Sequence, residues 1–450
     1  MNLQTLIKNI HVVNEGKIEV NDVWIKNGCI EKVGKINELP SDIKVIDGTG
    51  KYLIPGIIDG QVHFRDPGLT HKADLYTETK AAVAGGVTAF MDMPNTVPNV
   101  LTLEVLNEKY KIASEKSLAN YGFFMGVNMD NMEEVLKMDT SQFFALSDDG
   151  LYFTKKGNLL ADNVPLLDDL FRKANCVIAL HSEKEGIVER NEEKYREEYG
   201  EEIPFNLHPV IRSVEACAQA TEELVELAKK HNARLHILHL TTGEETKHFR
   251  NDIPFKDKKI TTEVCVQHLW FSQEDYHTLG AKIKWNPAIK FKEDKEKLLE
   301  ALVDDRIDLI TTDHAPHTIE EKSGNYFQAI SGAPMIQHSL NVMLEFYRQG
   351  KISFEKVVQK MCHNPADLYE IDKRGYIREG YAADIAIVDL NSPWTVSKEN
   401  IHYKCGWSPM EGTEFQAKVT HTFVNGNLVY EHGVFNDKVK GQALKKKKTI

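Results

Sequence analysis

Eight short apolar runs, separated by longer amphipathic stretches rich in Glu and Lys, dominate the middle of the chain. Each run has the length of a strand, and the alternation with helical stretches is typical of a parallel sheet built from βα units. Eight such units close a (β/α)8 barrel, so the chain is predicted to be an α/β protein with a TIM-type barrel. The predicted strands span 53–64, 87–93, 120–126, 142–147, 176–181, 234–240, 259–265 and 308–314.

Both ends of the chain have a different sequence pattern from the middle. The first 52 residues contain short β-like runs broken by turn signals, and the same texture returns near the C-terminus. There, Asn425-Gly426 lies between two β-rich runs, as a hairpin turn does. We therefore expect residues 1–54 and 366–450 to form one small β domain, and residues 55–365 to form the barrel.

Composition excludes several classes of partner. The 450 residues include 55 basic and 67 acidic ones, and the net charge of -12 argues against a nucleic-acid partner. The run Lys445 to Lys448 is interpreted as a solvated chain end. No apolar stretch reaches 18 residues, so no membrane segment is expected. The six cysteines are scattered without a CxxC pair, which favours a reducing compartment, and the cytoplasm is the expected location.

Polar residues follow several of the predicted strands at the ends where barrel active sites lie. The first strand leads to His63, the fifth to His181 and the eighth to Asp313. In the sixth strand, His236 and His239 are three apart and should face opposite sides, so His239, nearer the strand's end, is expected to point inward. Imidazoles and carboxylates that converge on one barrel mouth suit Zn²⁺.

These segments closely resemble the dihydroorotase family of the amidohydrolase superfamily, and the β-rich runs at both chain ends resemble the small β-sandwich domain of that family. The matching stretches are PGIIDGQVHFRDPG (55–68), AGGVTAFMDMPNTVPN (84–99), LHSE (180–183), LHLTT (238–242), KWNPAIK (284–290) and TTDHAPH (311–317). The resemblance implies a catalytic acid/base, metal ligands and substrate-binding residues. The acid/base is Asp313. The metal ligands are His63, His181, His239 and Asp313. The substrate-binding residues are Arg65, Asn95, Asn286 and His317.

The resemblance also implies a reaction. It is the reversible hydrolysis of the cyclic amide of (S)-dihydroorotate to N-carbamoyl-L-aspartate, a step of de novo pyrimidine (UMP) biosynthesis. A metal-activated hydroxide would attack the ring carbonyl, with Asp313 moving the proton. Arg65 and Asn95 would hold the substrate carboxylate, which suits a guanidinium fork backed by an amide. The only partners expected are this small molecule and further copies of the chain, in a homo-oligomer such as a dimer.

Three positions depart from the family pattern. Gln61 replaces the first histidine of an HxH motif, and Gln267 replaces a histidine that commonly precedes His268. The bridging ligand is usually a carboxylated lysine, and an ungapped alignment of GNLLADN (157–163) places Asp149 there. Asp149 is predicted to be a metal ligand, although Asp-Gly is also a common turn. One tightly held zinc ion is therefore expected, with two as the alternative.

Two other functions stay open. Another cyclic-amide hydrolase, such as a hydantoinase, dihydropyrimidinase or allantoinase, could use the same scaffold, but Arg65 with Asn95 favours a substrate that carries a carboxylate. A catalytically silent homologue that serves as a partner protein would explain Gln61, Gln267 and the missing lysine. The segment 320–335, which follows the last predicted strand, is either a mobile lid or an ordinary long connection.

Overall fold

Strands follow one another at the predicted intervals through the middle of the chain. The computed structural model describes residues 4–37, 42–151 and 160–447. Its barrel strands all run parallel to one another and confirm the eight predicted positions, the third strand being divided into β8 and β9. They are β6 (Ile57–Val62), β7 (Val87–Asp92), β8 (Asn120–Phe123), β9 (Met125–Gly126), β10 (Ala145–Ser147), β11 (Val177–Leu180), β12 (Leu235–Ile237), β13 (Ile260–Cys265) and β14 (Leu309–Thr311).

The barrel closes between its first and last strands. Val62 forms a parallel bridge with His314, and the backbone N–H of His63 donates to the carbonyl of His314 at 2.8 Å. On the other side, the N–H of Phe144 donates to the carbonyl of Phe123 at 3.1 Å, which joins β8 to β10. Closure leaves no exposed sheet edge and brings the C-terminal ends of all strands to one mouth.

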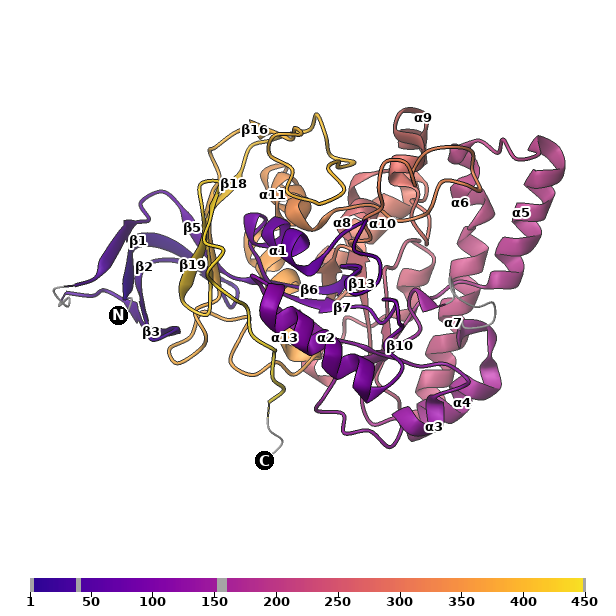
Figure 1. Ribbon diagram of the computed structural model, residues 1–450, viewed down its shortest axis with the longest axis horizontal. Helices are drawn as coiled ribbons and strands as arrows, with labels where there is room; N and C mark the ends of the chain where they lie inside the picture. The colour runs from indigo at the N-terminus through magenta and orange to yellow at the C-terminus, as the bar shows by residue number, and fades with distance from the viewer. Residues whose placement is uncertain (1–3, 38–41, 152–159, 448–450) are drawn as a thin grey trace.

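Helices surround these strands (Figure 1). Local sequence explains where several begin. Asp74 caps α1 by accepting from the N–H groups of Tyr76 and Thr77, and Ser213 caps α7 by accepting from Ala216. The longer helices are α1 (Leu75–Ala84), α2 (Leu103–Lys116), α4 (Val164–Lys173), α5 (Glu185–Tyr199), α7 (Val214–His231), α10 (Lys292–Val303) and α11 (Ser339–Arg348). Shorter ones are α3 (Met132–Val135), α6 (His208–Ile211), α8 (Val266–Trp270), α9 (Tyr276–Leu279), α12 (Phe354–Val358) and α13 (Asn364–Leu368).

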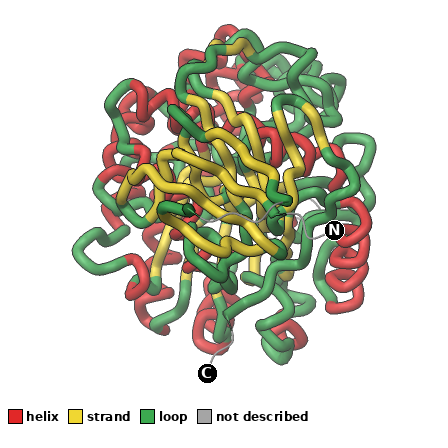
Figure 2. Tube along the Cα trace, turned by 90° about the vertical axis from the view of Figure 1, so that its left-hand side faces the viewer, coloured by secondary structure: helices red, strands yellow, loops and turns green. Residues whose placement is uncertain are grey.

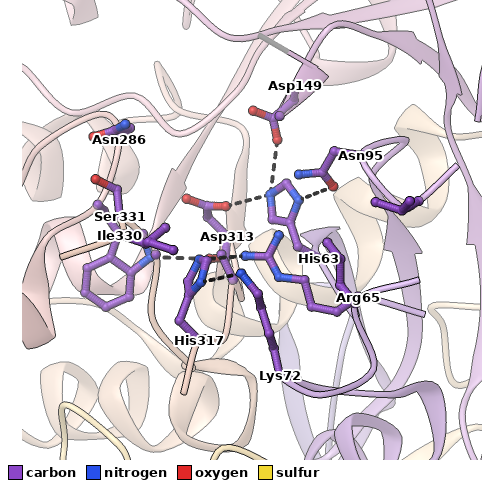
Figure 3. Close-up of a pocket in the computed structure, with 16 residues that line it drawn as sticks. His63, Arg65, Lys72, Asn95, Asp149, Asn286, Asp313, His317, Ile330 and Ser331 are labelled. Atoms are coloured by element: carbon purple, nitrogen blue, oxygen red, sulfur yellow. Dashed lines mark hydrogen bonds and ion pairs between the residues drawn. The ribbon is translucent and has the colours of Figure 1, made fainter. Parts of the chain in front are cut away.

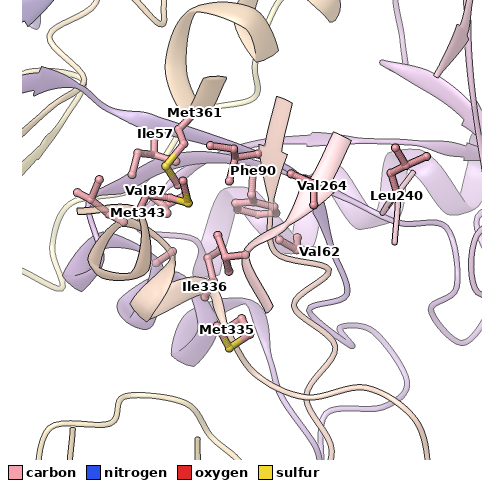
Figure 4. Close-up of a cluster of buried hydrophobic side chains, with 14 of the residues drawn as sticks. Ile57, Val62, Val87, Phe90, Leu240, Val264, Met335, Ile336, Met343 and Met361 are labelled. Carbon is pink, nitrogen blue, oxygen red and sulfur yellow. The ribbon is translucent and has the colours of Figure 1, made fainter. Parts of the chain in front are cut away.

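The largest hydrophobic cluster packs barrel strands against these helices (Figure 4). Val62 and Phe90 come from strands and Met343 comes from α11, and all three are fully buried. Phe90 also packs against Phe64, with ring centroids 4.5 Å apart. Burial of apolar surface on this scale is the main force that holds the barrel, and so the ends of its strands, in place.

Both chain ends meet in a β domain beside the barrel, as predicted (Figure 1). Its mixed nine-stranded sheet has the order β20-β19-β18-β15-β5-β1-β2-β3, with β4 paired to β1. The strands are β1 (Thr5–Asn14), β2 (Lys17–Lys26), β3 (Cys29–Gly34), β4 (Lys44–Asp47), β5 (Tyr52–Pro55), β15 (Ile385–Asp389), β18 (Lys418–Val424), β19 (Asn427–Glu431) and β20 (Val434–Phe435). A separate two-stranded sheet joins β16 (Trp394–Thr395) to β17 (Glu414–Phe415).

The β domain has its own hydrophobic core, to which Ile7, Ile25 and Phe423 contribute. When the molecule is viewed from the side of the β domain, the strands occupy the middle and helices lie at the margin (Figure 2). The predicted hairpin turn is confirmed, because Asn425 and Gly426 both have positive φ and connect β18 to β19. The predicted domain boundaries at 54/55 and 365/366 stay a prediction, and β5 and α13 span them. Within the described ranges, no helix is long and apolar enough to cross a membrane.

Candidate active site

The predicted site residues meet at the mouth of the barrel. A cavity of about 280 Å³ opens there (Figure 3), and it is lined by His63, Arg65, Asn95, Asp149, Asn286, Asp313 and His317. The other two predicted residues, His181 and His239, lie in a group with Asp149. Residues from seven segments, far apart in the sequence, therefore share one location. Lys72, which the sequence analysis did not consider, also lines the cavity.

One group of metal-ligand types consists of Asp149, His181 and His239. His181 Nδ1 lies 3.1 Å from His239 Nε2, and Asp149 Oδ1 lies 3.8 Å and 3.7 Å from these two nitrogens. All three side chains are buried. Asp149 lies in a turn and faces the histidines at the same time. Of the stretch GNLLADN that suggested this ligand, residues 157–159 lie outside the described residues.

The orientation of His181 suits this group. Its Nε2 lies 2.9 Å from Glu183 Oε2, and Glu183 forms an ion pair with Arg212. Burial tends to raise the pKa of Glu183, but Arg212 and His181 hold it well below its usual range, so this carboxylate only accepts. The hydrogen of His181 is therefore assigned to Nε2, and Nδ1 presents its lone pair to Asp149 and His239.

A second group shares Asp149 with the first and adds His63 and Asp313. His63 Nε2 lies 3.0 Å from Asp313 Oδ1 and 3.2 Å from Asp149 Oδ2 (Figure 3). Burial alone would lower the pKa of His63, but hydrogen bonds to Asp149 and Asp313 raise it to about 10. The positive charge of this imidazole offsets the two buried carboxylates. A metal cation would compete with that proton for the same oxygens and nitrogen.

The two carboxylates have different electrostatic environments. Burial raises the pKa of Asp313. Burial acts on Asp149 in the same direction, but hydrogen bonds from His239 and His63 hold its pKa well below the usual range. Asp149 thus keeps its charge, whereas Asp313 is the carboxyl that takes up a proton more readily. Two carboxyl groups that differ in this way can act as ligand and as acid/base, respectively.

The opposite wall of the cavity is cationic. Arg65 Nη2 donates to His317 Nε2 at 3.1 Å, and Arg65 Nε donates to the carbonyl of Pro316 at 3.3 Å. Lys72 Nζ lies 3.2 Å from His317 Nδ1 and 2.9 Å from Glu321 Oε1. Burial lowers the pKa of His317 well below its usual value, so the ring is neutral and Arg65 supplies the charge. Such a wall can bind a carboxylate.

The two predicted asparagines have different surroundings. Asn95 Oδ1 lies 2.8 Å from His63 Nδ1, so Asn95 orients a histidine of the second group as well as lining the cavity. Asn286 also lines the cavity, and its buried Oδ1 has no hydrogen-bond partner among the described residues. A buried amide oxygen without a partner is costly unless a ligand or water satisfies it. Asn286 therefore offers a hydrogen-bonding position to a substrate.

Three further residues bear on the interpretation of the sequence. His236 is hydrogen-bonded to Thr261 and Glu263 inside the barrel. The alternation of side chains along a strand does not explain why His239 points toward Asp149. β12 ends at Ile237, and His239 lies beyond it with a φ of 36°. Gln267 donates to the carbonyl of Thr312 at 2.8 Å and belongs to neither metal-ligand group.

The donor atoms fit a bound metal ion. Both groups combine imidazole nitrogens with carboxylate oxygens within 4.8 Å of one another. This donor set suits zinc and related transition metals. The hydrogen bond from His181 to Glu183 is the kind of outer contact that orients metal-binding histidines. The first group, Asp149 with His181 and His239, is the set that would hold the ion most directly.

Comparisons with known proteins find relatives along nearly the whole chain. Dihydroorotase of Pyrococcus abyssi is 31% identical over 96% of this chain and 96% of its own length. Dihydroorotase of Lactococcus lactis is 32% identical over 95% and 99%, respectively. Among solved structures, the L-hydantoinase of Arthrobacter aurescens superposes with a TM-score of 0.91 at 24% identity, covering 99% of this chain and 100% of its own, which shows the shared fold. The model of the amidohydrolase family matches residues 52–429, and the chain belongs to that family.

Proposed function

We propose that the protein is a zinc-dependent dihydroorotase that interconverts (S)-dihydroorotate and N-carbamoyl-L-aspartate. The observation that carries the proposal is the pairing, in one cavity, of a metal-ligand cluster with the Arg65–His317 wall. Dihydroorotate has a feature that matches each part of the site. Its cyclic amide would be opened at the metal-ligand cluster, and its carboxylate would bind the cationic wall. The similarity to dihydroorotases over nearly the whole chain supports the same substrate.

The cationic wall would orient the substrate. Arg65 is held by Pro316 and His317, so its guanidinium meets a carboxylate without much loss of side-chain freedom. Asn286 would satisfy its buried amide oxygen with a ring N–H. With its carboxylate at Arg65, the substrate ring would lie between this wall and the carboxylates of Asp149 and Asp313, which also line the cavity. This orientation would bring the cyclic amide beside the groups that could cleave it.

Asp313 would move the proton. When bound, zinc supplies an activated water nucleophile and polarises a carbonyl. Asp313 takes the proton from the attacking water and delivers it to the amide nitrogen as the ring C–N bond breaks. Burial raises the pKa of Asp313, which favours uptake of the proton by this carboxylate. His63, 3.0 Å from Asp313 and held by Asn95, keeps the carboxyl group in place during the transfer.

A silent homologue would need no such convergence. Asp313, Arg65 and His317 all point into the same cavity (Figure 3), although Arg65 follows β6 and the other two follow β14. The replacement of the usual lysine by Asp149 leaves a charged carboxylate facing His181 and His239. The residues therefore retain a complete set for binding a metal ion, moving a proton and holding an anion.

The test is a substrate comparison on protein purified without chelator. We expect about one equivalent of zinc, and a kcat/KM for dihydroorotate at least about 100-fold above those for hydantoin, dihydrouracil and allantoin, because Arg65 is unpaired with neutral rings. A preference for a neutral ring would identify another cyclic-amide hydrolase. Full zinc occupancy with no turnover of any of these rings would favour the silent homologue.

A further inference from the structure

Gln61 lies near the end of β6 and is completely buried. Its Nε2 donates to Asp149 Oδ2 at 3.2 Å. Its Oε1 lies 3.9 Å from the sulfur of Cys265, which is also completely buried. The side chain thus connects the end of one barrel strand to a residue of the metal-ligand cluster. Gln61 occupies the position of the first histidine in the HxH motif of the dihydroorotase family.

The partners of Gln61 determine which end of its amide faces Asp149. A charged carboxylate only accepts hydrogen bonds, so an amide oxygen at 3.2 Å from Asp149 Oδ2 would be repelled. On the other side, burial raises the pKa of Cys265 well above its usual value, so its S–H is retained and can donate to Gln61 Oε1. Both neighbours therefore favour the nitrogen toward Asp149 and the oxygen toward Cys265.

The two oxygens of Asp149 then have separate partners. Oδ2 faces Gln61 Nε2 and His63 Nε2, each at 3.2 Å. Oδ1 faces His239 Nε2 at 3.7 Å and His181 Nδ1 at 3.8 Å. A carboxylate on a short turn could rotate about its Cβ–Cγ bond, and hydrogen bonds to one oxygen restrict that rotation. Gln61 and His63 thereby direct the other oxygen toward the two histidines.

We infer that Gln61 is a positioning residue of the metal centre, whose amide holds Oδ2 of Asp149 so that Oδ1 completes a site for one metal ion with His181 and His239. The inference deepens the proposed function and rests on the metal dependence proposed there. An amide N–H₂ has no lone pair to offer a cation, so Gln61 contributes no ligand to a second ion. The glutamine that breaks the HxH motif thus supports Asp149, which replaces the usual lysine.

The test is a titration of metal-free protein with Co²⁺, whose visible absorption reports its coordination without any turnover. We expect one equivalent to bind the wild type. Gln61→Met keeps the length of the side chain but removes the donor, and it should weaken Co²⁺ binding about 10- to 100-fold and alter the absorption spectrum. If Gln61→Met does not fold, Gln61→Asn, which withdraws the amide by one methylene, should show the same loss.

Gln267→Met is the matched control. Gln267 is also a completely buried glutamine near the barrel mouth, but its amide donates to the backbone of Thr312 and not to Asp149. Its Co²⁺ affinity should stay within about threefold of the wild type, far from the loss expected for an outer contact of the metal. Equal affinities of Gln61→Met and the wild type would overturn the inference. So would a wild type that binds two equivalents tightly and a Gln61→Met variant that binds one.

Failure of this inference differs from failure of the proposed function. A wild type that binds one Co²⁺ but opens no dihydroorotate after zinc is added would overturn the function and leave the role of Gln61 standing. A wild type that turns over dihydroorotate, with unchanged Co²⁺ binding in Gln61→Met, would do the reverse.

Discussion

Asp313 adopts a backbone conformation that residues other than glycine seldom adopt. Its φ is 44°, and Arg65 and His239 also have positive φ, at 65° and 36°. Each such residue costs about 1–3 kcal/mol unless the surrounding structure compensates. Three of the predicted site residues thus carry local strain that the barrel sustains. Strain of this kind is concentrated where side chains must point in a particular direction, here toward the cavity.

Replacement of Asp313 by Asn should abolish turnover. The amide has nearly the same shape but cannot carry the proton, so we expect kcat to fall by at least about 100-fold, the usual contribution of a general acid/base. Steady-state ring opening of dihydroorotate measures the loss. A melting temperature close to the wild type would show that the fold is intact. Turnover within about twofold of the wild type would refute the role of Asp313 in proton transfer.

Replacement of Arg65 by Met should act on substrate binding. The methionine keeps some of the packing but removes a buried charge that would face the substrate carboxylate. Because a charge-assisted hydrogen bond contributes about 1.5–3 kcal/mol, kcat/KM for dihydroorotate should fall about 10- to 150-fold, mainly through KM. Arg65→Lys keeps the charge but loses the two-pronged guanidinium, so its kcat/KM should lie between those of the wild type and Arg65→Met. Unchanged kinetics in Arg65→Met would remove the carboxylate site from the proposal.

Sequence predicted which residues meet, but not how they hold one another. Residues at the C-terminal ends of parallel strands must converge, which is why His63, His181 and Asp313 were found from the sequence. Lys72 was missed because it lies in the loop before α1, where no periodicity points to the cavity. The contact of Asn95 with His63 depends on side-chain rotamers that no spacing reveals.

At the scale of elements, the predicted strands were right in place but too long. The eighth was predicted to reach residue 314, yet β14 ends at Thr311, and β12 ends at Ile237 instead of residue 240. In both cases the positive-φ residues of the site lie just beyond the strand, at Asp313 and His239. Around His239 the apolar residues Leu238 and Leu240 continue the strand-like pattern, whereas the backbone has already left the sheet.

The segment that follows β14 is fastened over the cavity. Ile330 and Gly332 line the cavity, and buried Lys322 donates to the backbone carbonyls of both, at 2.7 Å and 2.8 Å. Lys284 reaches the same segment by donating to the carbonyls of Tyr326 and Ala329. Of the two interpretations offered from the sequence, these contacts favour a fixed connection over a freely moving lid.

Lys322→Met should therefore loosen this segment. Removing the side-chain amine leaves buried carbonyls without their donor, so hydrogen exchange across residues 318–332 should accelerate at least about tenfold, since a local loss of about 1.4 kcal/mol is a factor of ten in opening. KM for dihydroorotate should rise, because the cavity wall becomes less ordered. Exposed Lys351→Met is the control and should change neither quantity. Unchanged exchange in Lys322→Met would show that the segment is held by other contacts.

For the whole molecule, one buried carboxyl group links stability to pH. Burial raises the pKa of Asp59 to about 7, although Thr312 and the N–H of Gln61 donate to it. The unfolded value is about 3.9, so between about pH 4 and 7 the folded state holds a proton that the unfolded state lacks. Stability from this group is therefore fully present below pH 4 and is lost as pH rises to 7.

Asp59→Asn removes this titration. Over the same window the variant should gain stability relative to the wild type, by up to about 1.4 kcal/mol per pH unit, and the difference should level off above about pH 7. Urea unfolding at pH 5, 6, 7 and 8 measures it. A constant difference between the two proteins across the four pH values would mean that Asp59 does not titrate in this range.

Removal of the metal tests whether an ion bound at the metal-ligand cluster stabilises the fold. Five buried groups, His63, Asp149, His181, His239 and Asp313, place carboxylates and imidazoles together at the centre of the barrel mouth. An ion that binds only the folded state stabilises it by about 2.7 kcal/mol when its concentration is 100 times Kd. Dialysis against a chelator should therefore lower the melting temperature by several degrees, and Zn²⁺ but not Mg²⁺ should restore it, because nitrogen ligands disfavour Mg²⁺. The difference should shrink as the pH falls, because protons compete with the metal ion for the imidazoles. Equal melting temperatures with and without chelator at pH 7.5 would contradict a bound metal, whatever the substrate proves to be.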